Sequence, residues 1–177
     1  MAAELPLSTR PSKDRRYLIA DPHLRFWTRF LGPALPLLER GRSDVVLRRI
    51  RGGWTSWRGR AVEPVVREAL ARLLPDDRFP DVVEVGSFWT RTSDVEIDLV
   101  AADREPIARR LFFAGSVKRL EDRPFDDHDL IELARAQAAL PGGGDLPMIA
   151  VSRAGFTTGG LAAAYGPDDL IRAWEAR

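Results

Sequence analysis

The chain has 177 residues, a formal net charge of +1 at pH 7, 45% hydrophobic and 30% charged residues, and no cysteine. This composition is typical of a soluble globular protein with one sizeable core, and it excludes disulfides, thiolate metal sites and a cysteine nucleophile. The sequence contains no run of about 18 apolar residues, and its N-terminus lacks the apolar segment of a secretory signal. We therefore expect a cytoplasmic protein with no membrane span.

The small net charge conceals an uneven distribution of charge along the chain. Residues 1–60 carry 13 Lys and Arg against 5 Asp and Glu, whereas residues 61–177 carry 14 against 21. A basic first part is typical of proteins that bind a polyanion or an acidic partner, although the two parts could equally neutralise each other across the fold. Only Lys13 and Lys118 are lysines among the 27 basic residues, and Lys118 ends an apolar run.

The first part of the chain predicts a flexible arm followed by several helices. Asp21 and Ser43 can each cap a helix, whereas Gly52 and Gly53 are expected to end one. In chain order the expected elements are an arm over residues 1–16, a strand at 17–20, helices at 22–31, 33–39 and 44–50, and a longer helix at 56–74.

The rest of the chain predicts a β-rich domain. Runs rich in β-branched and aromatic residues alternate with short polar stretches, as strands and turns do. The expected elements are strands at 82–89, 94–101, 109–118 and 146–152, a helix at 127–140 before the last strand, a short helix at 159–165 and a further element at 168–175. This order predicts an α/β (or α+β) fold, with a mixed sheet of four or five strands flanked by helices on both faces.

The chain is thus expected to have three parts. They are a flexible arm over residues 1–16, a helical lead-in over 17–55, and the main α/β domain over 56–177. We expect the chemistry of the protein to lie in the third part, where the polar residues of the strands gather.

Two carboxylates and a lysine are expected to meet on one face of the sheet. Glu96 and Asp98 are two residues apart on one strand, as are Ser116 and Lys118 on the next, so each pair shares a strand face. Pairing of these strands would bring Asp98, Ser116 and Lys118 to one sheet end, and Glu63 lies on the preceding helix. Metal-dependent phosphodiester hydrolysis requires such groups, because Mg²⁺ prefers oxygen ligands and lysine stabilises a charged phosphate. An ordinary ladder of charged residues on a half-buried sheet is the alternative.

Several segments, taken together in their order and spacing, resemble one known family. They are YLIADPHLRFWTRFL (17–31), the helix carrying Glu63, VVEVGSFWTRTSDVEIDLVA (82–101), GSVKR (115–119) and IAVSRAGFT (149–157). These segments resemble the C-terminal PD-(D/E)XK nuclease-like domain of archaeal-type AAA+ ATPases, which also occur in bacteria. The opening ELPLSTRPSKDRRYLIADP resembles the last part of a winged helix, so the lead-in would be a wing remnant plus helices.

The resemblance implies a restriction-endonuclease-like fold in which Asp98 binds the metal, Lys118 is the lysine of the motif and Glu63 is the acid on the helix. The family usually has glutamate at the position of Ser116, and a neutral hydroxyl is a poor ligand for Mg²⁺. Glu96 could partly replace it as a metal ligand. The sequence leaves open an active DNA endonuclease that holds Mg²⁺ or Mn²⁺, and a degenerate domain without metal that binds DNA or docks on an ATPase module in cis or in trans.

A second candidate interface is the densest basic and aromatic stretch of the chain. Trp54 and Trp57 stand there among Arg48, Arg49, Arg51, Arg58 and Arg60. Arginine contacts phosphates and tryptophan stacks on bases, so this stretch is a candidate nucleic-acid interface. A solvated arginine-rich face with the tryptophans in the core would give the same pattern.

Other kinds of chemistry find no support in the sequence. The chain has no G-x-x-x-x-G-K-[ST] loop, and we expect it to bind no nucleotide cofactor. The two histidines, His23 and His128, have no metal-ligand spacing, and no G-x-S-x-G motif is present. A third alternative is a protein-interaction domain without nucleic acid, whose affinity for DNA would be negligible and nearly independent of salt.

Overall fold

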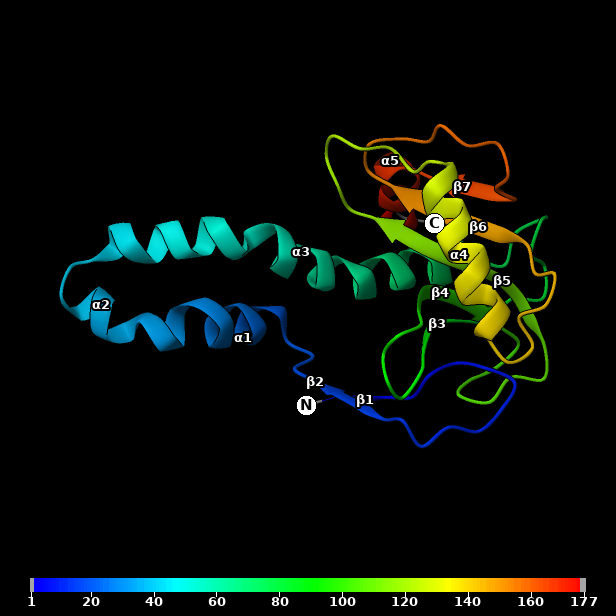
Figure 1. Cartoon of the computed structure of the whole chain (residues 1–177), viewed down its shortest axis with the longest axis horizontal. Helices are drawn as coiled ribbons and strands as arrows, with labels where there is room; N and C mark the ends of the chain where they lie inside the picture. The colour runs from blue at the N-terminus through cyan, green and yellow to red at the C-terminus, as the bar shows by residue number, and fades with distance from the viewer. Residues whose placement is uncertain (1, 176–177) are drawn as a thin grey trace. The chain divides into compact units, whose positions relative to one another are not determined.

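The computed structural model describes residues 2–175, which form two compact units (Figure 1). The first unit contains strand β1 (Ala2–Glu4) and Arg16–Pro64, and the second contains Leu5–Arg15 and the chain from Val65 onward. Residue 1 of the predicted arm and residues 176–177 of the predicted main domain lie outside the described residues. Each unit therefore takes in a piece of the N-terminal region.

The first unit is a helical hairpin preceded by a small ribbon in which β1 pairs antiparallel with β2 (Arg16–Leu18). Asp21 caps the first helix as predicted, because its Oδ1 accepts the Leu24 N–H at 2.9 Å. The first arm of the hairpin is α1 (Pro22–Phe26), the π-helical turn η1 (Trp27–Leu31), the 3-10 turn η2 (Gly32–Ala34) and α2 (Leu35–Glu39), and the second arm is α3 (Ser43–Leu73) up to Pro64.

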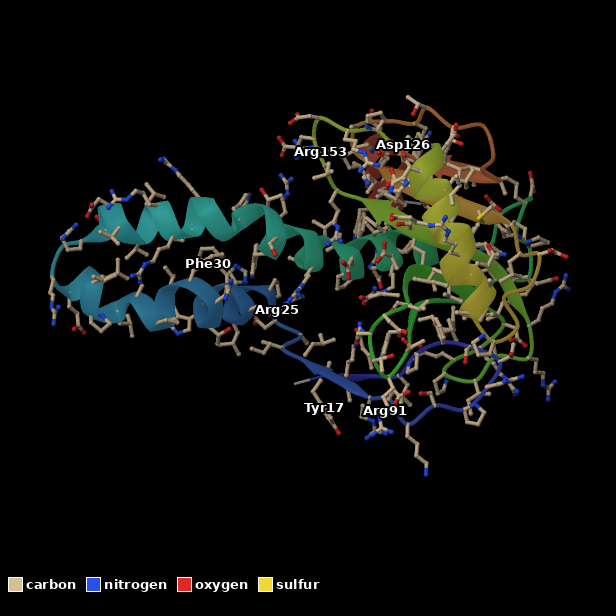
Figure 2. All side chains as sticks on the ribbon, viewed as in Figure 1. Tyr17, Arg25, Phe30, Arg91, Asp126 and Arg153 are labelled. Atoms are coloured by element: carbon tan, nitrogen blue, oxygen red, sulfur yellow. The ribbon has the colours of Figure 1, made fainter. Side chains whose placement is uncertain are left out.

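Aromatic side chains hold the two arms of the hairpin together. The Trp57 ring lies 5.4 Å from the Phe26 ring and 6.2 Å from the Phe30 ring, measured between centroids, and it stacks on Trp54 at 5.2 Å. Phe30 is buried, and Figure 2 shows it between the arms. Gly53 lies against this ring, since an added Cβ there would be 2.9 Å from Phe30 Cε1. The close approach of the two arms therefore depends on a glycine at this position.

Helix α3 corrects one prediction, which placed a helix end at Gly52 and Gly53. The helix runs without interruption over Ser43–Leu73. Glycine lowers the stability of a helix by about 1 kcal/mol but does not by itself end it, and the aromatic contacts of the hairpin outweigh that cost.

Pro64 also lies inside α3. A proline has no N–H, so Pro64 cannot donate the helical hydrogen bond to the carbonyl of Arg60, four residues earlier. The Arg25 guanidinium of the first arm donates to this carbonyl at 3.2 Å. The position of the Arg25 side chain thus follows from a gap in the hydrogen bonding of α3.

The second unit is built on a five-stranded mixed sheet with the order β3-β4-β5-β6-β7. Strands β3, β4 and β5 are antiparallel, whereas β6 is parallel to β5 and β7 to β6, because helix α4 carries the chain across between β5 and β6. The elements are β3 (Glu84–Trp89), β4 (Glu96–Ala102), β5 (Leu111–Lys118), α4 (Asp127–Ala139), β6 (Met148–Ser152) and β7 (Ala163–Tyr165). The mixed sheet with its helices, together with the N-terminal helical part, confirms the predicted α+β class.

The core of the second unit includes part of the segment that was expected to be a flexible arm. Leu7 is 2% exposed, and its N–H donates to the Ser87 carbonyl at 2.8 Å. It packs in one cluster with side chains of the sheet and of α4, among them Phe88, Ile97, Val100, Leu111 and Leu133. Residues 5–15 are therefore part of the folded unit, because Leu7, with Pro6 and Ser8 buried beside it, fills a place in its core.

The short helix expected at 159–165 is also corrected, because the structure has strand β7 there. This strand extends the sheet beside β6 and buries Ala163 and Tyr165. Burial and pairing with a neighbouring strand outweigh the helix propensity of its alanines. Helix α5 (Pro167–Ile171) and the 3-10 turn η3 (Arg172–Trp174) follow. None of the helices within residues 2–175 is long and apolar enough to cross a membrane.

Separate alanine substitutions at Gly52 and Gly53 test the packing of the hairpin. A Cβ at Gly52 would meet nothing within 4 Å, so Gly52→Ala should raise the free energy of unfolding by about 0.5–1 kcal/mol through helix propensity alone. Gly53→Ala gains the same propensity but pushes against the buried Phe30 ring, and it should be less stable than Gly52→Ala. Urea unfolding followed by circular dichroism measures both, and equal stabilities would contradict the close contact.

Candidate functional site

The candidate site lies where strands β4 and β5 separate in the second unit. The ladder between the two strands ends with Leu99 opposite Gly115. Asp98 and Ser116 lie just beyond this last pair, on neighbouring strands. The sequence predicts that Asp98, Ser116 and Lys118 meet at this sheet end. A hydrogen bond joins Asp98 and Ser116, whereas Lys118 pairs with Asp129.

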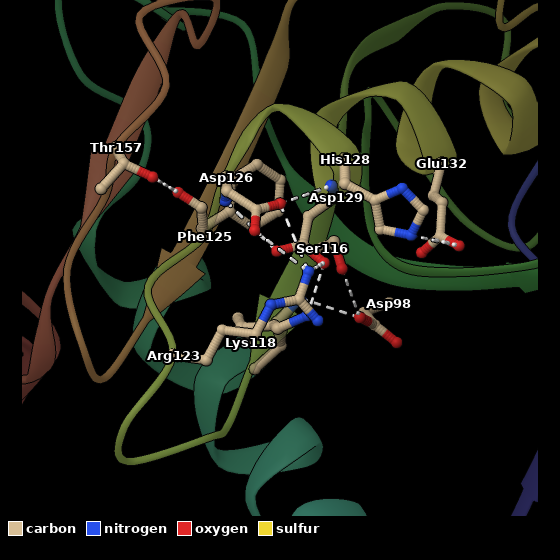
Figure 3. Close-up of polar contacts among 11 residues, drawn as sticks. Asp98, Ser116, Lys118, Arg123, Phe125, Asp126, His128, Asp129, Glu132 and Thr157 are labelled. Carbon is tan, nitrogen blue, oxygen red and sulfur yellow. Dashed lines mark hydrogen bonds and ion pairs between the residues drawn. The ribbon is translucent and has the colours of Figure 1, made fainter.

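Beyond the last backbone pair of β4 and β5, the Asp98 carboxylate accepts hydrogen bonds from β5. Its Oδ2 accepts hydrogen bonds from the Ser116 hydroxyl at 3.1 Å and from the Val117 backbone N–H at 2.8 Å. Burial raises the pKa of Asp98, and the hydrogen bond from Val117 and the charge of Arg119 offset this only in part. Asp98 is thus a poorly hydrated carboxylate, and its hydrogen bonds come from the neighbouring strand β5 (Figure 3).

Lys118, at the end of β5, is paired with a carboxylate from helix α4. Its Nζ lies 2.5 Å from Oδ1 of Asp129, and the two side chains are 17% and 8% exposed. Arg123, in the loop between β5 and α4, contacts the same oxygen at 3.2 Å. In such a buried pair each charge depends on the other, because removing one partner leaves the other unpaired in a setting of low dielectric constant.

The same aspartate also fixes the start of helix α4. The Asp129 N–H donates to Asp126 Oδ1 at 3.1 Å, and the Asp126 N–H donates to Asp129 Oδ2 at 3.2 Å, which is a reciprocal capping box. The hydrogen bond from the Asp129 backbone lowers the pKa of Asp126. Arg123 bonds Asp126 Oδ2 at 3.1 Å. Strand end, loop and helix start therefore form one charged network (Figure 3).

Sequence reasoning missed two members of this charged network. Asp129 and Arg123 were not singled out, although the acidic run around Asp126 was expected to begin a helix. The spacing of Asp126 and Asp129 suits a capping box, but no local pattern connects Asp129 with Lys118 across the intervening loop. Ser152, opposite Lys118 in the β5–β6 register, is 1% exposed, and its Oγ has no hydrogen-bond partner among residues 2–175.

The other predicted site residues are spread over both units. Glu96 is exposed at the start of β4, and its charge contributes to the raised pKa of Asp98. Glu63 lies on α3 in the first unit, directly before Pro64.

The five predicted DNA-binding arginines all lie on α3 in the first unit. Arg48 pairs with Asp44 at 3.2 Å, while Arg49 and Arg51 are exposed. The tryptophans between them pack within the hairpin, yet Trp54 keeps 39% of its surface exposed. The stretch therefore combines an aromatic core with an accessible basic surface.

The residues at the end of β4 and β5 do not fit the metal site that the family resemblance implies. A Mg²⁺ ion takes about six oxygen ligands, with one or two carboxylates among them. Here Asp98, which is partly buried, is bonded to a serine where the family that the sequence resembles has a glutamate. Within residues 2–175, no three His, Asp or Glu side chains are grouped so that they could hold a metal ion.

Comparison with known proteins identifies a family but no activity. The model of a family described as "Archaea bacterial proteins of unknown function" (DUF234) matches residues 27–118, just over half of the chain. The chain is also 31% identical over 113 residues to the uncharacterized protein MJECL04 of Methanocaldococcus jannaschii. This match covers 63% of the chain and 25% of that protein, so the chain spans only a part of the length of its relative. No solved structure gives a significant match.

Replacing Asp98 by asparagine tests the state of the buried carboxylate. A raised pKa means that stability falls as the pH rises from the ordinary value of 3.8 through the folded value. Asp98→Asn removes the charge and keeps an oxygen for the Val117 N–H, so it should melt at a higher temperature than the native chain at pH 7. The difference should shrink towards about pH 4. Calorimetry at both pH values measures it, and a lower melting temperature of Asp98→Asn at pH 7 would contradict it.

Removal of the Asp129 carboxylate tests the charged network. Asp129→Ala leaves Lys118 without its partner and breaks the capping box, so the free energy of unfolding should fall by about 3–5 kcal/mol. Asp127→Ala is the matched control, since Asp127 is exposed in the same helical turn. Urea unfolding compares the two variants, and similar losses would show that the pair with Lys118 contributes little.

Proposed function

We propose that this chain, which belongs to the DUF234 family of archaeal and bacterial proteins of unknown function, is a degenerate PD-(D/E)XK nuclease-like domain that binds DNA without cleaving it. The five-stranded sheet of the second unit would be its restriction-endonuclease-like scaffold. The domain would work in the cytoplasm beside an AAA+ ATPase module, in cis or in trans.

The observation that carries this proposal is the pairing of Lys118 with Asp129 at 2.5 Å. In a nuclease the lysine must offer its charge to the phosphate that reacts. Lys118 instead faces a buried carboxylate that Arg123 also contacts. A phosphate would have to displace Asp129, at the cost of leaving that carboxylate with fewer partners, so the lysine is poorly placed for catalysis.

The pair of Asp98 and Ser116 supports the same conclusion. A glutamate at position 116 would put a second carboxylate beside Asp98, and two such groups repel each other unless a cation lies between them. The serine hydroxyl instead donates a hydrogen bond to Asp98. The end of the two strands thus offers one carboxylate where the motif of the resembled family has two, which favours binding without cleavage.

DNA binding is assigned to the helical hairpin of the first unit. Residues 16–64, which make up most of this unit, have 10 basic side chains against 4 acidic ones. Arg49 and Arg51 are exposed on α3, and Trp54 beside them is partly exposed. Arginines supply the contacts to phosphate that dominate affinity for nucleic acid, and an accessible indole supplies a surface for stacking.

Docking on a protein partner such as an ATPase module is a second candidate function. The hairpin exposes several large apolar side chains, which in a monomer are a sign of an interaction surface when they gather. They are Leu24, Trp27, Leu35 and Leu47, each between 40% and 49% exposed. This role is compatible with DNA binding, because it uses apolar rather than basic side chains.

A cleavage and binding assay with one labelled DNA set tests the proposal. The native chain should leave the DNA intact in Mg²⁺ or Mn²⁺ but bind it with an affinity that falls steeply as salt rises. Ser116→Glu restores the carboxylate that the PD-(D/E)XK nuclease-like family has at this position. Lys118→Ala is the matched control, because it removes the lysine of the same motif.

Three outcomes of this assay are decisive. Cleavage by the native chain that Lys118→Ala abolishes would overturn the proposal and establish an active endonuclease. Cleavage by Ser116→Glu alone would support descent from a nuclease that has lost its activity. Absence of any salt-dependent binding to DNA would leave the protein-interaction role as the working view.

A further inference from the structure

The helical hairpin of the first unit forms a polar pocket of about 400 Å³ that is open to solvent. Three arginines, Arg25, Arg29 and Arg60, line it together with the hydroxyl-bearing residues Thr28 and Ser56. Only Arg60 among these arginines belongs to the basic stretch that the sequence pointed to. The fold thus brings cations from both arms of the hairpin to one hollow.

The three arginines of the pocket are not neutralised by carboxylates. Within residues 2–175, none of them takes part in an ion pair. Arg48 of the same hairpin does, since it lies 3.2 Å from an oxygen of Asp44. Guanidinium groups that share a hollow repel one another, and an anion placed among them would remove that repulsion.

Arg25 is held at the pocket by the gap that Pro64 leaves in α3. Its Nη2 donates to the Arg60 carbonyl at 3.2 Å, which is the carbonyl that Pro64 cannot serve. A guanidinium has five N–H donors, so this bond leaves several for a ligand. The side chain is thereby oriented before any ligand arrives, which reduces the entropy lost on binding.

Arg29 reaches the pocket from the π-helical turn η1. In this turn the Gly32 N–H donates to the Trp27 carbonyl, five residues earlier, so the turn is wider than in an α-helix. Single π-helical turns occur frequently at functional sites, because they reposition the side chains that they carry. Thr28 and Arg29 both belong to the turn and both line the pocket.

We infer that this pocket binds a phosphate group of a DNA strand, an assignment that rests on the proposed DNA-binding function. The guanidinium groups of Arg25, Arg29 and Arg60 would hold the phosphate, since a planar guanidinium matches the oxygens of phosphate in pairs of hydrogen bonds. Ile19 and Trp57 form the apolar part of the lining and would pack against the attached sugar or base. The volume is within the range of pockets that hold small organic ligands and exceeds the needs of a bare phosphate.

Binding of a labelled single-stranded oligonucleotide to the full chain, followed by fluorescence anisotropy, tests the inference. Arg29→Ala should weaken binding by about tenfold, because it removes charge-assisted hydrogen bonds to phosphate. It should also reduce the slope of affinity against salt, on logarithmic axes, by about 0.7 for one lost phosphate contact. Arg40→Ala is the matched control, because Arg40 is an exposed arginine of the hairpin outside the pocket lining. Equal effects of the two substitutions would overturn the inference and leave the proposed function intact.

Calorimetric titration with dTMP separates the pocket from the DNA-binding function. Binding of both dTMP and DNA, each weakened by Arg29→Ala, would support the inference in full. Binding of dTMP without binding of DNA would overturn a DNA strand as the source of the phosphate, and with it the proposed function. Binding of neither would overturn both.

Discussion

The polar end of the sheet depends on the carboxylate of Asp129. It pairs with Lys118 on β5, contacts Arg123 in the loop, and accepts the backbone N–H of Asp126 at the start of α4. The Asp129 side chain thus links a strand, a loop and a helix, which are otherwise different elements of secondary structure. The network is costly to break, because Asp129 is buried and its removal would take a carboxylate partner from both Lys118 and Arg123. Lys118 therefore belongs to the internal charge balance of the protein, which is the physical reason to propose binding rather than catalysis.

The helical hairpin depends on two features that weaken a helix in isolation. Gly53 lowers helix propensity, yet it lets the Phe30 ring approach α3. Pro64 removes a backbone hydrogen bond, yet the Arg60 carbonyl accepts one from the Arg25 guanidinium instead and so orients that side chain. In both cases the local cost is offset by a contact between the two arms. Helix α3 stays continuous over 31 residues despite Gly53 and Pro64. Tertiary contacts, rather than helix propensity, decide its length.

Elements that form through interactions between residues close in sequence can be predicted from the sequence, whereas those that depend on distant residues cannot. The three antiparallel strands and α4 were predicted, since alternating patterns and a helix cap are local signals. The contact between Asp98 and Ser116 followed from strand alternation and the hairpin. The continuity of α3 through Gly52 and Gly53, the burial of Leu7, and the pairing of Lys118 with Asp129 depend on contacts between segments distant in sequence. One sequence taken by itself contains no local signal of such contacts.

The basic side chains that have a carboxylate partner, and those that have none within residues 2–175, indicate where an anion would bind. Near the sheet, Lys118 and Arg123 face Asp129, and Arg153 lies 2.5 Å from an oxygen of Glu121. Each of these cations already has a carboxylate, so an incoming phosphate would gain little there. In the hairpin, by contrast, the arginines that line the pocket have no such partner among residues 2–175. The net attraction for phosphate is therefore expected in the hairpin, even though the family resemblance directs attention to the strands. Under the proposed function, the paired charges at the end of β5 and the arginines that line the pocket favour holding a polyanion over cutting it.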